Sequence, residues 1–201
     1  MRQEKVQVAT YQKAKRGNHC CGDSYFYKET DREFICVLSD GLGSGKYAKQ
    51  SSQIVVDIIK DHLHVPIEQL TTKLNEQLLG KRGVVLGILK MNFDEQRYSF
   101  SSIGNIGVMT ITNGERKRMI PSTGYLAGFQ RPFKKVIGKI EPEMTFLLFS
   151  DGVTDRDLSQ RFLLNTNANM DELIQQFTAY HQNRIIDDTT LIAMHYRGSK
   201  D

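Results

Sequence analysis

The sequence predicts an α+β fold in which antiparallel sheets and helices occupy separate parts of the chain. Runs that are apolar, or that alternate between apolar and polar residues as strands do, follow one another without a helical pattern over residues 84–149. Helical spacing of apolar residues is confined to residues 45–80 and 170–181. A doubly wound parallel sheet would require strands and helices to alternate throughout, so this grouping favours antiparallel sheets.

Three strands are predicted at the start of the chain. Residues 6–11 alternate, residues 24–27 are rich in aromatic side chains, and residues 33–38 form an apolar run typical of a buried strand. Asp31 and Arg32 are read as the turn between the second and third strands.

Two helices are predicted next, after the glycine-rich loop Asp-Gly-Leu-Gly-Ser-Gly of residues 40–45. Small or apolar residues recur on one face at helical spacing: Ala48, Ser52, Val55, Val56, Ile59 and Leu63. Pro66 suits the first turn of a second helix, and Gly80 is a plausible stop. The apolar positions of that helix are Leu70, Leu74 and Leu78.

The second half of the chain predicts mostly strands. Their expected ranges are residues 84–91, 97–103, 107–112, 116–120, 132–140, 144–149 and 190–196. Asn113-Gly114 is a signal for a two-residue hairpin turn. One further helix is expected over residues 170–181, before the last strand.

Composition limits the classes of function. The chain has 201 residues, 39% of them hydrophobic and 25% charged, so we expect a single globular domain over residues 1–201. The net charge of +4 comes from dispersed lysines and arginines, which does not predict a nucleic-acid partner. Apolar runs are shorter than the ~18 residues of a membrane span, and no signal peptide is recognised, so a cytoplasmic location without a membrane partner is expected. The three cysteines lack a Cys-x-x-Cys pattern and predict neither a zinc site nor a disulfide framework.

Acidic residues stand where predicted strands end or tight loops begin: Asp23, Asp40, Asp151 and the pair Asp187 and Asp188. Carboxylate oxygens, with glycines that allow close backbone approach, suit hard divalent cations. Acids that converge without a positive charge repel one another, and a divalent cation would offset that repulsion. A single Asp-Gly pair is more often a simple turn, and the glycine-rich loop lacks the patterns of a P-loop or a dinucleotide fold.

Taken in order, these motifs resemble the metal-dependent protein phosphatase (PPM) family over essentially the whole chain. The order is Gly-Asp near the start, Asp-Gly-x-Gly after a strand, Ser-Asp-Gly late, and Asp-Asp-x-Thr before the final strand. Residues 81–83 at the start of a strand and the glycine turn of residues 102–105 agree with this. The short length and the Asp-Gly-Leu-Gly form of the loop place the chain in the bacterial branch. Residues 21–24, 40–45 and 122–128 are similar to those of phosphatases that act on the stressosome.

The resemblance implies a four-layer αββα sandwich, in which two antiparallel sheets are flanked by helices. It also implies a site for two divalent cations, Mn²⁺ or Mg²⁺, at one end of the sandwich. By position in the motifs, Asp40 would bridge the two ions. The implied ligands are Asp23 and the carbonyl of Gly41 for one ion, and Asp151 and Asp187 for the other. The same four aspartates are the implied catalytic residues, and Asp155 and Asp188 are possible additional ligands.

The implied function is hydrolysis of phosphoserine or phosphothreonine in phosphorylated STAS-domain proteins of a stressosome, which would negatively regulate the general stress response. An alternative from another class is a catalytically weak PPM-fold binding module that regulates a partner protein. A third reading, a phosphodiesterase that acts on nucleic acid, is disfavoured by the dispersed charge. Lys15 and Arg16 precede Asp23 without the spacing of the phosphate-binding arginine of eukaryotic relatives, so their role stays open. His19 is interpreted as an exposed loop residue.

Overall fold

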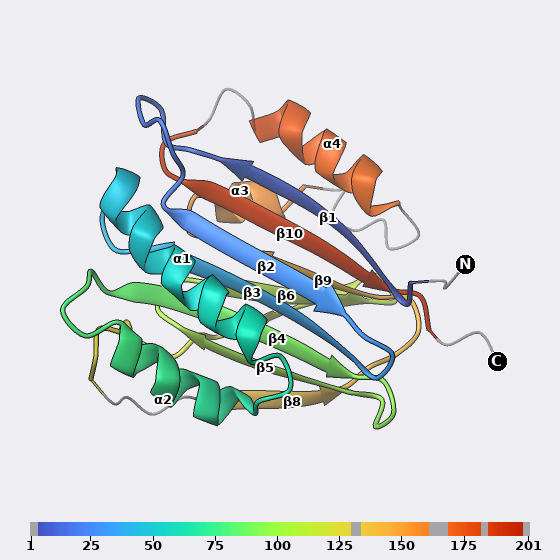
Figure 1. Cartoon of the computed structure of the whole chain (residues 1–201). Helices are drawn as coiled ribbons and strands as arrows, with labels where there is room; N and C mark the ends of the chain where they lie inside the picture. The colour runs from blue at the N-terminus through green and yellow to red at the C-terminus, as the bar shows by residue number, and fades with distance from the viewer. Residues whose placement is uncertain (1–3, 130–133, 161–168, 182–184, 199–201) are drawn as a thin grey trace.

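The computed structural model describes residues 4–129, 134–160, 169–181 and 185–198. In this part of the chain two five-stranded antiparallel sheets are present (Figure 1). The first has the order β1 (Val6–Lys13), β10 (Thr189–Tyr196), β9 (Met144–Phe149), β6 (Gly107–Thr112) and β7 (Glu115–Met119). The second has the order β2 (Asp23–Glu29), β3 (Glu33–Gly41), β4 (Val84–Asn92), β5 (Arg97–Ile103) and β8 (Lys135–Lys139).

Helices cover the outer face of each sheet. Helices α1 (Gly45–Asp61) and α2 (Ile67–Gln77) lie over the second sheet, and α4 (Met170–His181) lies over the first (Figure 1). The short helix α3 (Asp155–Leu158) packs on the same side as α4, because Leu158 joins the apolar cluster that α4 buries. The predicted αββα sandwich is confirmed.

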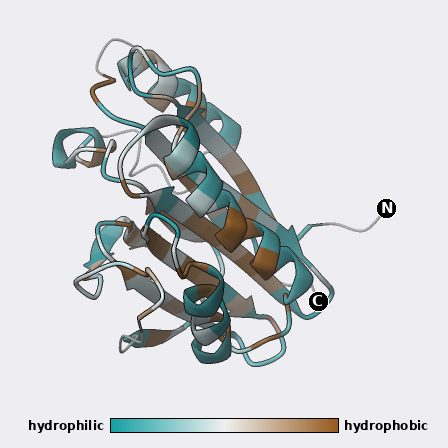
Figure 2. Cartoon of the chain, turned by 60° about the vertical axis from the view of Figure 1, so that its left-hand side comes forward, coloured by the Kyte–Doolittle hydropathy of each residue, from teal (hydrophilic) through white to brown (hydrophobic). Residues whose placement is uncertain are grey.

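Three apolar clusters separate the four layers, and the strands supply them by alternation. In β3, Cys36 and Leu38 point into the cluster between the sheets, while Ile35 and Val37 point toward α1 and α2. This is the period of two that a strand requires, and it explains why a strand buried on both faces reads as a continuous apolar run. Hydrophobic residues accordingly concentrate on the strands, and hydrophilic residues on the connecting loops (Figure 2).

The predicted elements are present with shifted ends. Helix α1 ends at Asp61, so Leu63 lies beyond it, although its side chain still packs against the cluster under the helix. Part of the strand predicted over residues 132–140 falls outside the described residues, and β8 itself begins at Lys135. Helix α3 was not predicted; Thr154 and Asp157 form a capping box at its start.

No helix among the described residues combines the length and the apolar character that a bilayer crossing demands.

Candidate metal centre

The acidic motifs meet at the end of the sandwich where β3 and β9 finish and where β2 and β10 begin. Asp23 opens β2 and Asp40 lies near the end of β3, and the two are paired across the antiparallel ladder. Directly opposed residues of such a pair point to the same face of the sheet, so the two carboxylates are neighbours. Asp23 is buried and Asp40 is partly exposed at the edge.

The first sheet supplies the remaining acids. Asp151 follows β9 after Ser150, and Asp187 and Asp188 precede β10, which pairs with β9. Hydrogen bonds join these loops to the second sheet, since Ser150 Oγ and Thr190 Oγ1 both donate to Oδ2 of Asp23, at 2.8 and 2.6 Å. The carboxylate of Asp23 therefore lies at the junction of the two sheets.

Burial and mutual repulsion raise the pKa values of these carboxyl groups. The pKa of Asp40 is raised to about 8, first by burial and then by the charges of Asp23, Asp151 and Asp188. Burial also raises the pKa of Asp23 to about 6, against the lowering effect of the hydrogen bonds from Thr190 and Ser150. The pKa of Asp151 is raised by burial and by the charge of Asp187. The carboxyl groups cannot all ionise at neutral pH without a nearby positive charge.

No described lysine or arginine provides that charge. Among the residues that the structure describes, none pairs with the carboxylate of Asp23, Asp40 or Asp151. Lys49 is close to Asp23, but its Nζ donates to the backbone carbonyl at 2.8 Å. The Oδ1 atom of Asp23 is buried and has no hydrogen-bond partner. A buried carboxylate oxygen without a partner lowers the stability of the fold, and a bound cation would offset that cost.

These residues suit a divalent cation by their chemistry, because all the converging donors are oxygens. The side chains are not yet arranged as a complete coordination shell, since no three described His, Cys, Asp or Glu side chains form a group that could hold an ion. A bound ion would therefore need water molecules or small side-chain rotations to complete its shell.

The structure distinguishes the two members of the Asp187–Asp188 pair. Asp188 is buried, and its two carboxylate oxygens accept hydrogen bonds from the backbone N–H groups of Lys15 (2.8 Å) and Gly22 (2.9 Å). Asp187 is more exposed, with a side chain 47% accessible, and lies 3.5 Å from Nζ of Lys15. Asp188 thus holds the loop before β2 in place, whereas the more exposed Asp187 accepts hydrogen bonds at Oδ1 from the N–H of Asp188 and from Lys15.

Replacing Asp188 with asparagine should therefore lower the free energy of unfolding clearly, while kcat falls only mildly. The amide keeps one acceptor oxygen and loses the other, so one of the two backbone N–H groups is left without its partner. We expect a loss of about 2 kcal/mol in the free energy of unfolding, as for a hydrogen bond to a charged group. Urea unfolding and kcat at saturating Mn²⁺ measure the two effects. A kcat as low as that of Asp187→Asn, with stability unchanged, would show that Asp188 is the metal-binding member.

Asp155 lies outside this cluster. It is the first residue of α3, its side chain is 83% exposed, and it forms an ion pair with Arg118. Its charge is not among the main causes that shift the pKa of Asp23, Asp40 or Asp151. Its role as an additional ligand stays an untested prediction with little geometric support.

Some residues at the site were not singled out from the sequence. Ser150 and Thr190 hold Asp23, and Asn105 donates from Nδ2 to Oδ2 of Asp151 at 2.6 Å. All three lie inside motifs that were noted, yet their side-chain roles depend on contacts between the two sheets. Lys15, whose role was left open, contacts the Asp187–Asp188 pair, and His19 is exposed.

An αββα sandwich with carboxylates gathered where strands of both sheets end defines the class of metal-dependent protein phosphatases. Comparison with known proteins agrees. Residues 30–197 match the family described as Stage II sporulation protein E (SpoIIE). Phosphoserine phosphatase RsbX of Bacillus subtilis (strain 168) is 32% identical over 190 residues, which cover 94% of each chain.

Solved structures lead to the same class. A crystal structure of RsbX in complex with magnesium matches with a TM-score of 0.87 and 30% identity, over 97% of both chains. The Mycobacterium tuberculosis serine/threonine phosphatase PstP/Ppp matches with a TM-score of 0.77 over 96% of this chain and 99% of its own. At 14% identity the second match supports the fold only.

This chain belongs to the SpoIIE family of PP2C-type phosphatases. It is therefore a phosphatase, a hydrolase of the PPM class, and phosphatases of this class use divalent metal ions. The motifs of residues 21–24, 40–45 and 122–128 indicate RsbX in particular, and the match to RsbX confirms that interpretation.

Proposed function

We propose that this chain is a serine/threonine protein phosphatase that dephosphorylates STAS-domain proteins of a stressosome in the cytoplasm. It would thereby negatively regulate the general stress response, with residues 1–201 as a single phosphatase domain. The observation that carries the proposal is the convergence of Asp23, Asp40 and Asp151 without a described cation paired to their carboxylates. Similarity to RsbX, which is named a phosphoserine phosphatase, supports the substrate class.

Two divalent cations, Mn²⁺ or Mg²⁺, are proposed to bind among these carboxylates, with Asp40 shared between them. The proposed ligands are Asp23, Asp40, the carbonyl of Gly41, Asp151 and Asp187. When bound, such cations supply a water of lowered pKa and the positive charge that offsets phosphate oxygens in an in-line displacement. The magnesium in the RsbX crystal structure supports this choice of ion class.

The contribution of the chain itself is to hold these ligands in place. Ser150 and Thr190 fix Oδ2 of Asp23, while Oδ1 has no hydrogen-bond partner among the described residues. Asn105 orients the carboxylate of Asp151 in the same way. Because these donors come from the loop ends of both sheets, the ligand positions depend on the docking of one sheet against the other.

The proposed substrate leads to a prediction about recognition. We expect kcat/KM for a folded, phosphorylated STAS-domain protein to exceed that for a short phosphopeptide of the same local sequence by at least about tenfold, or about 1.4 kcal/mol. The reason is that contacts with the protein surface should add to those with the phosphorylated residue. Phosphate release from both substrates in the presence of Mn²⁺ measures the ratio.

Equal efficiency on the two substrates would contradict recognition of the folded partner. A binding module that uses the same fold would give a third result, namely association with the STAS-domain protein without any metal-dependent release of phosphate.

A further inference from the structure

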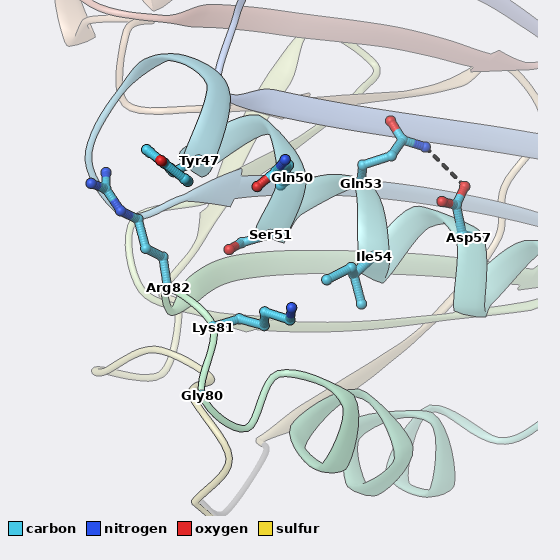
Figure 3. A pocket seen from close by; sticks show the side chains of 9 residues that line it. All are labelled: Tyr47, Gln50, Ser51, Gln53, Ile54, Asp57, Gly80, Lys81 and Arg82. Atoms are coloured by element: carbon cyan, nitrogen blue, oxygen red, sulfur yellow. Dashed lines mark hydrogen bonds between the residues drawn. The ribbon is translucent and has the colours of Figure 1, made fainter.

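We propose that a groove between α1 and the loop before β4 binds acidic residues that flank the phosphorylated residue of the substrate. This inference rests on the proposed function and extends it from the type of reaction to the choice of substrate. The groove has a volume of about 570 Å³. The lining residues that bear on its chemistry are Tyr47, Ser51, Gln53, Asp57, Lys81 and Arg82 (Figure 3).

The groove begins beside the candidate metal centre. The N–H of Leu42, two residues after Asp40, donates to the carbonyl of Gly83 at 2.8 Å, which ties the glycine-rich loop to the end of the groove. The guanidinium of Arg82 packs against the same loop, since a Cβ added to Gly43 would lie 2.5 Å from its Nη1. A peptide whose phosphorylated residue lies at the metal centre can therefore extend into the groove.

The charges in the groove favour an anion. Lys81 and Arg82 are exposed, and neither forms an ion pair with a carboxylate among the described residues. The guanidinium carbon of Arg82 lies 5.3 Å from the ring centroid of Tyr47, a cation–π contact between two residues that line the groove. The one acid in the lining, Asp57, already has a cation 3.8 Å away in Lys60 and accepts a hydrogen bond from Gln53 (Figure 3).

Ser51 adds a neutral hydrogen-bond donor to the groove. Ser51 is only 2% exposed and lines the groove. Figure 3 shows its hydroxyl directed from α1 toward the loop that carries Lys81 and Arg82. A carboxylate between this hydroxyl and the two cations would accept a hydrogen bond from it.

Carboxylate side chains of the substrate match this chemistry. The planar guanidinium of Arg82 can bind both oxygens of a carboxylate, while Lys81 adds a second charge and Ser51 a neutral donor. The exposed residues of the groove lie in contact with solvent, so each interaction should contribute only moderately to the binding free energy. Its main effect should be on the selection between substrates.

Two synthetic phosphoserine peptides test the inference. One carries glutamates on both sides of the phosphoserine, and the other carries glutamines at the same positions. With Mn²⁺ present, we expect the wild-type protein to hydrolyse the glutamate peptide with a kcat/KM at least about fivefold higher. Lys81→Gln and Arg82→Gln should each lower this ratio about twofold, and the double variant should bring it close to one. Their kcat/KM on p-nitrophenyl phosphate should stay within about twofold of wild type, because that substrate is too small to reach the groove.

Lys139→Gln is the matched control, since Lys139 is an exposed lysine on β8, outside the groove, and should leave the ratio unchanged. If the protein hydrolyses p-nitrophenyl phosphate but shows no preference for the glutamate peptide, the proposed role of the groove is wrong. The phosphatase assignment would then remain in place. If Arg82→Gln lowers kcat/KM on p-nitrophenyl phosphate as much as on the peptides, Arg82 acts on the scissile phosphate. That result would also contradict the proposed role of the groove. Absence of metal-dependent hydrolysis of every substrate would remove the proposed function and this inference together.

Discussion

Asp40→Asn is expected to lower kcat/KM by at least about 10³-fold on both p-nitrophenyl phosphate and phosphoproteins, with the fold intact. The pKa of Asp40 is raised to about 8, by burial and then by the charges of Asp23, Asp151 and Asp188. The amide removes the negative charge that two cations would share. It is also nearly isosteric with the neutral carboxyl group that burial favours in the absence of metal.

Thermal unfolding separates loss of the site from loss of the fold. Without metal, Asp40→Asn should unfold at or slightly above the wild-type temperature, because the substitution relieves repulsion among carboxylates. Added Mn²⁺ should stabilise the wild type and have little effect on the variant. Full activity of the variant at saturating Mn²⁺ would rule out Asp40 as the shared ligand.

Asp155→Asn is the control for this experiment, since it makes the same chemical change at an exposed residue paired with Arg118. Near wild-type activity is expected there, whereas Asp151→Asn and Asp187→Asn should each be severely impaired.

Gly41→Ala is expected to damage both stability and catalysis. A Cβ at Gly41 would overlap the backbone of Ala48 in α1, with its Cα at 2.7 Å and the carbonyl atoms closer still. Backbone cannot rotate away as a side chain can, so α1 must move from β3. We expect a loss of about 3 kcal/mol in the free energy of unfolding, or a fall in Tm of about 10 °C, with a strong fall in kcat.

Gly114→Ala separates this overlap from the general effect of replacing a glycine. Gly114 has a φ of +79° in the β6–β7 turn, and no atom lies within 4 Å of an added Cβ. Only backbone strain of about 1 kcal/mol is expected, without a change in kcat. If Gly41→Ala were no more harmful than Gly114→Ala, close contact between β3 and α1 would not be what positions the loop after Asp40.

The fold could be predicted because its strands and helices differ in hydrophobic period, and because the ordered acidic motifs span the chain. The ends of elements were harder to predict. Strand β3 continues to Gly41 because its backbone pairs with β4 beyond the apolar run, and polar Ser39 and Asp40 give no sign of this pairing. Helix α3 is too short to show a helical period.

The acidic residues of the site could be located from the sequence, but the hydrogen bonds that position them could not. The bond from Thr190 to Asp23 joins residues 167 apart, and the bond from Ser150 joins residues 127 apart. Such contacts depend on how one sheet packs on the other, which local patterns do not encode. The groove was not visible for the same reason, since α1 and the loop before β4 form it together.

The central claim is that the converging carboxylates serve a divalent cation in phosphate hydrolysis. The most direct test is the rate of phosphate release from a phosphoserine protein by chelator-treated enzyme, measured as Mn²⁺ is added back. We predict release at the background rate without metal and saturable recovery as Mn²⁺ binds, with no recovery in Asp40→Asn. Phosphate release that continues undiminished in excess chelator would contradict the claim.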